Sequence, residues 1–448
     1  MINPKSRRLI VDTDLGLDDL VALAILRVQQ CLIGSRSGGG DVDHEHHPHQ
    51  HNQHQHRPPL FHIVGVTLTS GISLANTENA SLLRRILPPG TPVYVSGWDA
   101  HHSTIDASPS SSSSSSSLLT PSHISRSHDR IKDDKPIWWT RTANRVSSFL
   151  SSLPHCHTPP SHSTNFEYNT TISAEQFIAT NLDDANVDFL CLAPLSTVAR
   201  ALQLCSSSSS STRVSAPKAS FYIMGGIQSD SRVTKRGEST SPFGYNDPIN
   251  TQNGQIPHQE MSKERDNFGE FNFALDSNAA RTVLSAVPNV RLIPLESCTL
   301  VPASLRSNSE VGCDVSLLSL ASVLKGIPPR DCDSASELHV ARNNLRTLLH
   351  EFGTTETQWD SIAAAIYCNA FGNNDCSKDS FDSVSTKVSL CKRLVSREME
   401  LSDLGEITFP TGQALDDEAP TATMQVFPNF TLENESVFMR YLTVLLQS

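Results

Sequence analysis

A dense group of aspartates near the start of the chain carries the most distinctive chemistry of the sequence. Asp12, Asp14, Asp18 and Asp19 lie within the stretch VDTDLGLDD. Carboxylates this close repel one another and resist burial unless a cation or water lies among them. Calcium and magnesium accept several carboxylate oxygens as ligands. Capping of a turn and of a helix start explains two of the acids without a metal, but explains all four poorly. The cluster therefore predicts a hard-cation site.

The residues around this group indicate how it is positioned. Leu9, Ile10 and Val11 form a short apolar run typical of a buried strand, and apolar residues at 20–26 recur with helical spacing. The aspartates therefore lie in the turn at the carboxyl end of the first strand. In open α/β sheets, ligands bind beyond this end of the strands.

Similar apolar runs recur along the chain and alternate with helical patterns. They lack strict polar and apolar alternation, as expected for strands covered on both faces. The predicted fold class is therefore α/β, with a mostly parallel central sheet flanked by helices and related to the Rossmann fold. The short motifs TSG, APLS and MGG follow the runs, where a site is expected. The predicted strands are 61–68, 92–95, 187–193, 221–224 and 290–295, with a helix from about 77 to 87.

Polar, low-complexity segments interrupt this pattern. One carries three consecutive glycines and a histidine-rich tract, and another contains an unbroken serine run at 110–117. Such compositions cannot build a hydrophobic core, and no catalytic role is assigned to the histidines. The sequence therefore predicts one domain, 5–448, with long surface inserts at 34–59, 101–131, 151–170, 205–216 and 228–264.

Charge and cysteine content exclude several classes of function. The chain of 448 residues has a formal net charge of -12 and no basic stripe, which argues against a nucleic-acid partner. No apolar run is long enough to cross a membrane. The first strand begins almost at Met1, which leaves no room for a signal segment, and the ten cysteines form no CxxC pair. These features predict a cytoplasmic protein.

Several motifs, in the right order, resemble those of the inosine-uridine preferring nucleoside hydrolases. VDTDLGLDD resembles the DTDPGxDD motif of that family, with Leu15 at the usual proline position. IVGVTLTSG, TENA, LAPLSTVARAL, MGG and GEFNFALDSNAA resemble later blocks. QWDSIAAAI resembles the HDPLA segment, and GEITFPTGQ and VFMRYLTVLL resemble the terminal strand and helix. The resemblance spans nearly all of the chain outside the inserts. It implies a hydrolase that cleaves the bond between ribose and a nucleobase.

The resemblance also implies a calcium cofactor, Ca2+, and its ligands. By motif position, Asp14, Asp19, Asp360 and the backbone carbonyl of Leu192 hold the ion. Carboxylate and carbonyl oxygens are the ligands that calcium prefers. Asp14 is the implied general base, which takes a proton from a water whose pKa the ion lowers.

Further residues are implied as contacts of the substrate, a small-molecule nucleoside. Asp18 is the implied acceptor for the ribose 2′-hydroxyl, and Met224 of the MGG motif belongs to the same substrate site. Glu270 and Asn272 resemble the ribose-binding pair of the family, and Asn267 is a looser candidate because the spacing before EFN is shorter than usual. An exposed turn before a helix is the alternative for Glu270 and Asn272. Negative groups around the ribose stabilise the positive charge that develops on the sugar.

Two departures from the family pattern bear on the substrate. Ile72 stands where the family has an asparagine, and Trp359 stands where many members have a histidine that helps to protonate the leaving base. A tryptophan there is similar to the purine-preferring branch, in which indole rings stack on the base. Purine preference is therefore expected, with packing beneath a helix as the alternative role of Trp359. The family also implies a homodimer or a homotetramer.

Two other functions compete with nucleoside hydrolysis. A strand ending in D-x-D also occurs in haloacid-dehalogenase-type phosphohydrolases, in which the first aspartate is the nucleophile and magnesium assists. That interpretation leaves the APLS, MGG and EFN motifs unexplained. A non-catalytic nucleoside-binding descendant is the second alternative, because of Leu15, Ile72 and the inserts.

Overall fold

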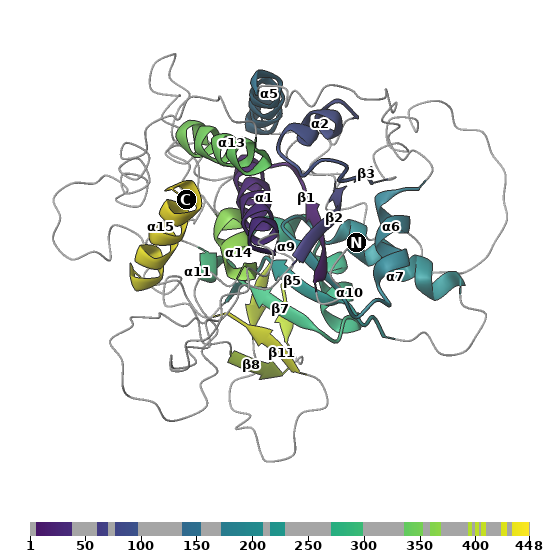
Figure 1. Cartoon of the computed structure of the whole chain (residues 1–448). Coiled ribbons are helices and arrows are strands. Elements are labelled where there is room, and N and C mark those ends of the chain that lie inside the picture. The colour runs from purple at the N-terminus through teal and green to yellow at the C-terminus, as the bar shows by residue number, and fades with distance from the viewer. Residues whose placement is uncertain are drawn as a thin grey trace, which may run out of the picture.

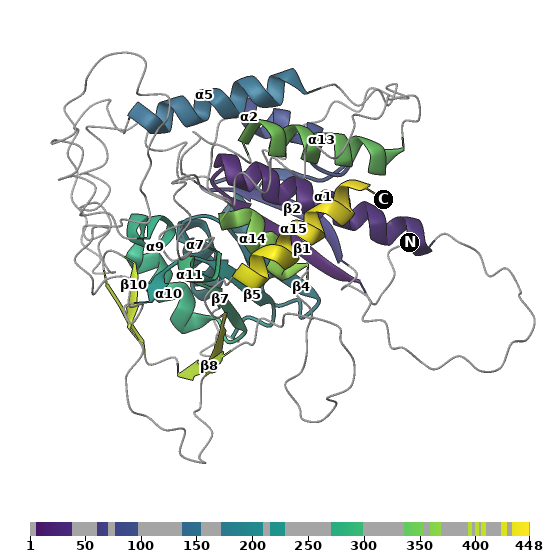
Figure 2. The same cartoon turned by 90° about the vertical axis from the view of Figure 1, so that its left-hand side faces the viewer.

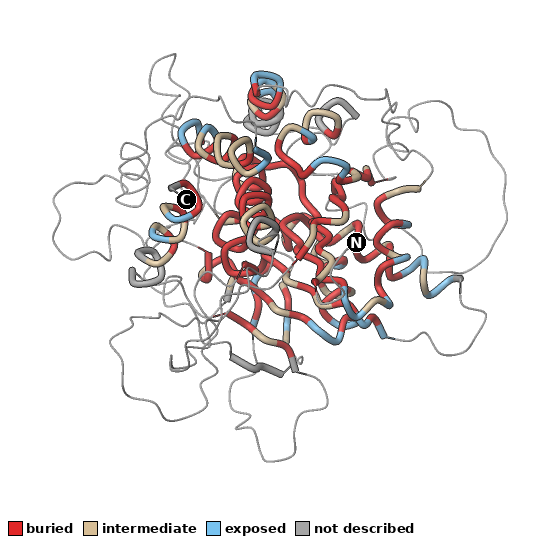
Figure 3. Tube along the Cα trace, viewed as in Figure 1, coloured by how far each residue is buried: buried red, intermediate tan, exposed pale blue. Residues whose placement is uncertain are grey.

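The computed structural model describes the part of the chain that forms a central sheet and its covering helices (Figure 1). The most buried segments lie together in the middle of the molecule (Figure 3). The described residues are 6–37, 61–69, 77–96, 137–153, 172–208, 216–228, 270–298, 336–352, 359–368, 393–396, 399–402, 405–408, 423–427 and 432–447.

An eight-stranded sheet forms the centre, in the order β3 (Val93–Val95), β2 (Phe61–Leu68), β1 (Arg7–Thr13), β4 (Val187–Cys191), β5 (Ser220–Met224), β7 (Val290–Ile293), β11 (Thr423–Val426) and β8 (Arg393–Ser396). Every neighbouring pair is parallel except β11 and β8, which are antiparallel. The strand order runs outward from β1 to β3 and resumes on the other side of β1 at β4. The carboxyl ends of β1 and β4 therefore flank a topological switch point, where ligands of such folds bind.

Helices cover both faces of the sheet (Figure 2). Side chains alternate along β1, so that Leu9 and Val11 join one hydrophobic cluster and Ile10 joins the other. The cluster of Leu9 includes residues of α1 (Leu17–Ser37), α2 (Thr77–Leu82), η1 (Leu83–Arg85), α5 (Ile137–Ser152), α11 (Leu295–Cys298), α13 (Glu337–Phe352), α14 (Trp359–Tyr367) and α15 (Leu432–Gln447). The cluster of Ile10 includes residues of α6 (Ala174–Asn181), α7 (Ser196–Ser208), α9 (Phe271–Leu275) and α10 (Ser277–Ala286).

A second, three-stranded sheet lies beside the MGG motif. Its strand order is β6 (Ile227–Gln228), β10 (Glu406–Thr408) and β9 (Glu400–Leu401). The N–H of Ile227 donates to the carbonyl of Gly405 at 3.0 Å. The resemblance of GEITFPTGQ to a terminal strand predicted β10, but β6 and β9 were not predicted, because they are too short to show a periodic pattern.

The predicted α/β fold with a mostly parallel sheet is confirmed. Each predicted strand is present, although the runs at 187–193 and 290–295 form strands only as far as Cys191 and Ile293. Strands β11 and β8 of the main sheet were not predicted. The helix predicted from about 77 to 87 is shorter, because α2 ends at Leu82 and the 3-10 turn η1 follows. Helices α1, α5 and α7 extend to Ser37, Ser152 and Ser208, so three predicted inserts begin inside helices. Apart from such edges, the predicted inserts lie outside the described residues.

Within the described ranges, no helix is both long enough and apolar enough to span a membrane. The cysteines that the structure describes are free thiols, namely Cys31, Cys191, Cys205, Cys298 and Cys368.

Candidate active site

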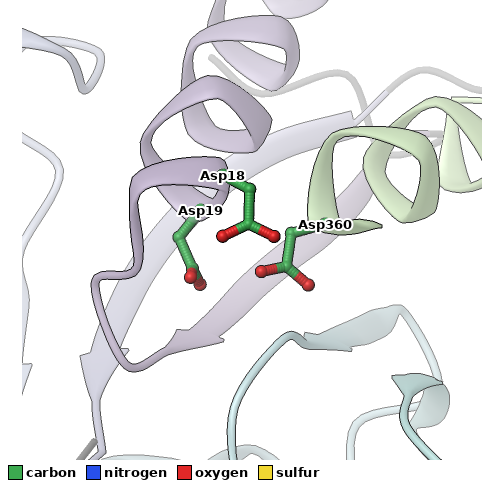
Figure 4. Close-up of side chains that lie close together, drawn as sticks. All are labelled: Asp18, Asp19 and Asp360. Carbon is green, nitrogen blue, oxygen red and sulfur yellow. The ribbon is translucent and has the colours of Figure 1, made fainter. Parts of the chain in front are cut away.

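Three aspartates from two helix starts lie together near the carboxyl end of β1, with their carboxylates turned toward one another (Figure 4). Asp18 and Asp19 occupy the first turn of α1, and Asp360 occupies the first turn of α14. The ligand oxygens of these three residues all lie within 4.8 Å of one another. The hydroxyl of Ser361 donates to the backbone carbonyl of Asp18 at 3.4 Å and so links the two helix starts. Helix starts carry partial positive charge, which favours acidic side chains there.

The cluster is largely buried in spite of its charge. Asp19 is 1% exposed and Asp360 is 5% exposed, while Asp18 is half-buried. Burial raises the pKa of Asp19 and of Asp360 well above the usual aspartate value, and the neighbouring carboxylates raise it further. Among the described residues, none is a hydrogen-bond partner of Oδ1 of Asp360. A buried acceptor without a partner, on a residue grouped with other carboxylates, fits a site built for a cation.

Asp14 adds a fourth carboxylate through the turn that precedes α1. It is 3% exposed, and its Oδ1 accepts a hydrogen bond from the Gly16 N–H at 3.0 Å. A Cβ atom at position 16 would lie 2.7 Å from Oδ2 of Asp19, 3.1 Å from Oδ1 of Asp18 and 3.4 Å from Oδ1 of Asp14. Three carboxylates therefore converge on the one residue of this turn that has no side chain. A side chain at Gly16 would fill the space between them.

The backbone of this turn is strained at Leu15. Its φ is 60°, and in the described part of the chain it is the only residue other than glycine with a positive φ. The Leu15 N–H donates to Oγ1 of Thr13 at 3.0 Å, and the Thr13 hydroxyl donates to Oδ1 of Asp19 at 2.5 Å. Proline could neither adopt a positive φ nor donate this hydrogen bond. The departure from the family motif at Leu15 therefore accompanies a turn that proline could not form.

Asp12 belongs to a separate polar network. It is fully buried, and Oδ1 accepts hydrogen bonds from the hydroxyls of Thr67 at 2.6 Å and Thr69 at 3.1 Å. The Thr69 hydroxyl also bonds to that of Thr197 in α7. Burial raises the pKa of Asp12 to about 7. The carboxylate of Asp12, the first aspartate of D-x-D, bonds to threonine hydroxyls and is not a member of the group that could hold a metal. This argues against the phosphohydrolase interpretation, in which the nucleophile acts beside the metal.

Leu192 and Asn272 bring the ends of β4 and β5 to the same region. The Leu192 N–H donates to the carbonyl of Asp12 at 2.8 Å, which places Leu192 beside the end of β1. The amide nitrogen of Asn272 donates to the carbonyl of Leu192 at 3.2 Å and to that of Met224 at 3.3 Å. The same nitrogen contacts the Met224 sulfur at 3.3 Å. Asn272 therefore holds the carbonyl that the sequence assigned to the metal, and its ribose contact stays a prediction.

Glu270 is a buried cap at the start of α9. It is 1% exposed, and its carboxylate accepts hydrogen bonds from the N–H groups of Gly226 at 2.8 Å, Asn272 at 2.9 Å and Phe273 at 2.8 Å. Burial raises the pKa of Glu270, and these three bonds act in the opposite direction. The alternative of an exposed turn is wrong for Glu270, because the carboxylate is buried. It joins the MGG motif to α9.

The two glycines of MGG allow close packing over their backbone. Gly225 and Gly226 have φ values of 157° and 79°. A Cβ atom on Gly225 would collide with the ring of Phe273, and one on Gly226 would collide with Ile407 of the small sheet. Both α9 and the small sheet therefore pack directly on the motif.

The remaining predicted residues divide into two groups. Trp359 begins α14 next to Asp360, is half-buried and packs against the hydrophobic cluster of Leu9. Asn267 and Ile72 lie outside the described residues, so the predictions for them remain open. Thr13 was not among the predicted site residues, although alternation along β1 from Leu9 and Val11 places it on the face of α1.

Comparison with known proteins connects this geometry to a family. A family model described as inosine-uridine preferring nucleoside hydrolase matches residues 52–395. The matched range includes Leu192, Glu270 and Asp360 but not the aspartate turn, which the structure brings to Asp360. A comparison with curated protein sequences finds no match.

Solved structures that are similar to this chain include three nucleoside hydrolases. A purine-preferring ribonucleoside hydrolase from Gardnerella vaginalis is 14% identical, with a TM-score of 0.45 and coverage of 98% of this chain and 99% of that chain. The plant nucleoside hydrolase PpNRh1 is 12% identical, with a TM-score of 0.44 and coverage of 98% and 99%. An inosine-guanosine nucleoside hydrolase is 15% identical, with a TM-score of 0.43 and the same coverage.

These TM-scores are below 0.5, so the assignment depends on the family model, which matches most of the chain. The motifs that carried the resemblance, MGG, EFN and the segment of Asp360, lie inside the matched range. The chain belongs to the inosine-uridine preferring nucleoside hydrolase family and is a hydrolase that acts on N-glycosyl bonds.

Proposed function

We propose that this nucleoside hydrolase depends on calcium, held by Asp14, Asp19, Asp360 and the carbonyl of Leu192. The observation that supports this most is that Asp360 lies in one group with Asp18 and Asp19, while its buried Oδ1 finds no hydrogen-bond partner among the described residues. The donor atoms are oxygens, and their negative charge matches a divalent cation. Asp18 is the most exposed of the three clustered aspartates, which supports its assignment to the ribose 2′-hydroxyl.

The roles of the residues follow from their charge and position. A bound calcium ion supplies positive charge that lowers the pKa of a nearby water. Asp14 accepts the proton that the water loses as its oxygen bonds to the anomeric carbon and the bond to the base breaks. The Gly16 N–H, which donates to Oδ1 of Asp14 at 3.0 Å, holds this carboxylate in place. Positive charge develops on the sugar as the base leaves, and Asp18 stabilises it.

We also propose a preference for purine nucleosides, which rests on Trp359 at the position of the histidine acid. Its half-buried side chain packs against the core at one side. Stacking between aromatic rings contributes about 0.5 to 1.5 kcal/mol beyond area burial, which gives at most about tenfold discrimination by binding alone. A larger ratio requires activation of the base for departure. The Trp359→Ala variant should then lower kcat for inosine by more than it raises KM.

The reaction assay tests both proposals on the metal-stripped, full-length protein. Release of free base from inosine, guanosine and uridine is measured with EDTA and with added calcium. Calcium should restore turnover, and inosine should react faster than uridine. The Asp360→Asn variant should lower kcat/KM by at least about 100-fold. The matched control is Asp184→Asn, because Asp184 lies on the surface and pairs with Arg8.

Four results would contradict these proposals. Equal turnover in EDTA and in calcium would show that the reaction does not depend on calcium. Near-normal turnover by Asp360→Asn would place the metal ligands elsewhere. Hydrolysis of uridine as fast as that of inosine would leave Trp359 as a packing residue. Release of phosphate from phosphate esters without release of base from nucleosides would favour the phosphohydrolase interpretation.

We further propose that the enzyme works in the cytoplasm. The described cysteines are free thiols, which is usual in a reducing compartment. A homodimer or a homotetramer is proposed from the family resemblance, and light scattering of the purified protein tests it.

A further inference from the structure

We propose that Thr13 is a positioning residue of the site: its hydroxyl, held by the Leu15 N–H, fixes the Asp19 carboxylate in the orientation that binds the cation. This inference rests on the proposed function, because it assigns Asp19 to a cation. It concerns a residue that contacts neither the cation nor the substrate. Thr13 is fully buried at the end of β1, on the face that α1 covers.

The partners of the Thr13 hydroxyl determine in which bond it accepts and in which it donates. A hydroxyl has a single proton and accepts through its lone pairs. The Leu15 N–H can only donate, and it donates to Oγ1 of Thr13 at 3.0 Å. Asp19 must be ionised to bind a cation, so its oxygens can only accept. The proton of Thr13 therefore points to Oδ1 of Asp19, which lies 2.5 Å away.

This bond determines which oxygen of Asp19 faces the cluster. With Oδ1 held by Thr13, Oδ2 lies on the side of Gly16, 2.7 Å from the place of a Cβ atom there. The nearest oxygens of Asp18 and Asp14 lie 3.1 Å and 3.4 Å from the same place. Without the hydroxyl, repulsion among these carboxylates would favour rotation of Asp19 away from its neighbours.

Leu15, whose backbone is strained, takes part in the same set of hydrogen bonds. Its φ is 60°, and its N–H donates to Oγ1 of Thr13. Such a backbone costs of order 1 to 3 kcal/mol and persists only when the surroundings hold it. The fully buried Leu15 side chain and the bond to Thr13 are the contacts that do so.

The experiment measures calcium affinity rather than activity. Calcium is titrated calorimetrically into the metal-stripped, full-length protein and its variants. Calcium is the suitable probe because the histidine-rich tract favours transition metals. Thr13→Val replaces the hydroxyl by a methyl group and keeps the branched shape. It should weaken calcium binding about 10- to 100-fold, the usual effect of losing a residue that orients a metal ligand.

Two controls separate positioning from general stability. Thr13→Ser keeps the hydroxyl and should bind calcium within about threefold of the parent, well below the effect of losing an orienting residue. Thr443→Val removes a hydroxyl that donates to Met439 within α15 at 2.8 Å, and it should leave the affinity unchanged. Melting curves in EDTA report whether each variant is folded. Thr13→Ala replaces Thr13→Val where the valine variant does not fold.

The outcomes distinguish this inference from the proposed function. If the parent binds calcium and Thr13→Val binds it equally well, Thr13 has no positioning role. If Thr13→Ser loses as much affinity as Thr13→Val, the hydroxyl is not the cause and the inference is wrong. If the parent itself neither binds calcium nor needs it for turnover, the proposed function fails first.

Discussion

Asp12 illustrates what burial does to a single residue of this protein. Its carboxylate is fully buried, with two threonine hydroxyls as partners, and burial raises its pKa to about 7. The unfolded chain has the ordinary value, near 3.8. Between these two values the folded state holds a proton that the unfolded state has lost. Stability from Asp12 is therefore fully present below about pH 4 and is lost as the pH rises to 7.

We expect the metal-free protein to lose stability as the pH rises from 5 to 7. The Asp12 share of this loss is on the order of 2 kcal/mol. Asp12→Asn, which resembles the protonated acid at every pH, should remove that share. Asp184→Asn is the control, because the pKa of Asp184 is lowered by the N–H of Asn186, so it titrates below this range. Urea unfolding in EDTA at several pH values is the measurement, and an unchanged slope in Asp12→Asn would show that Asp12 is ionised throughout.

The sequence predicted some roles of single residues and missed others. It identified the aspartate turn from the residues themselves. Asp360 was assigned to the metal site only through the resemblance to the family. The structure places Asp360 beside Asp18 and Asp19. Thr13 was missed because a threonine between two aspartates can make several different hydrogen bonds. Only the positions of α1 and Leu15 in the folded chain show which of them it makes. Glu270 was predicted to contact ribose, but pattern alone could not show that its carboxylate caps a helix.

At the scale of elements, two connections hold the site together. The starts of α1 and α14 supply the clustered aspartates, and alternation along β1 directs Thr13 toward α1 and Asp12 toward α7. The second connection is the start of α9, which Glu270 joins to Gly226. Six strands of the main sheet were predicted because each is a compact apolar run, whereas β11 and β8, with the sequences TMQV and RLVS, were not. In the small sheet, β6 and β9 were not predicted, because they have two residues each.

Glu270→Gln tests the connection between α9 and the MGG motif. The amide group of glutamine cannot accept at both ends, so some N–H groups of Gly226, Asn272 and Phe273 would lose their acceptor. We expect a loss of about 1 to 3 kcal/mol in the free energy of unfolding. Glu406→Gln, at an exposed position of β10, is the control. Unchanged stability together with a raised KM for inosine would instead make Glu270 a ribose contact alone.

At the scale of the whole molecule, one sheet and its two helical layers are interrupted by polar sequence. Helix α1 ends at Ser37 and β2 begins at Phe61, but contacts within the described part already join these elements. The side chain of Gln30 in α1 accepts a hydrogen bond from the N–H of Ile63 in β2 at 2.9 Å. The parallel pairing of β1 with β2 adds a ladder from Arg7 to Thr13, with one register shift between Leu9 and Ile10. The histidine-rich tract between them is therefore not needed to hold α1 against the sheet.

Deletion of residues 44–56 should leave the enzyme nearly unchanged. We expect the free energy of unfolding to stay within about 0.5 kcal/mol of the parent, because loop length contributes only weakly to stability. Values of kcat and KM for inosine should also be retained. A drop of several degrees in melting temperature, or a loss of turnover, would show that this tract contacts the folded part of the chain.

We propose that one calcium ion lies among Asp14, Asp19, Asp360 and the carbonyl of Leu192. Anomalous diffraction from crystals grown with calcium tests it directly. We predict a single strong peak at the switch point between β1 and β4, with ligand oxygens from all four residues at about 2.3 to 2.6 Å. A peak bound by other residues, or none at a calcium concentration that supports full turnover, would contradict the account.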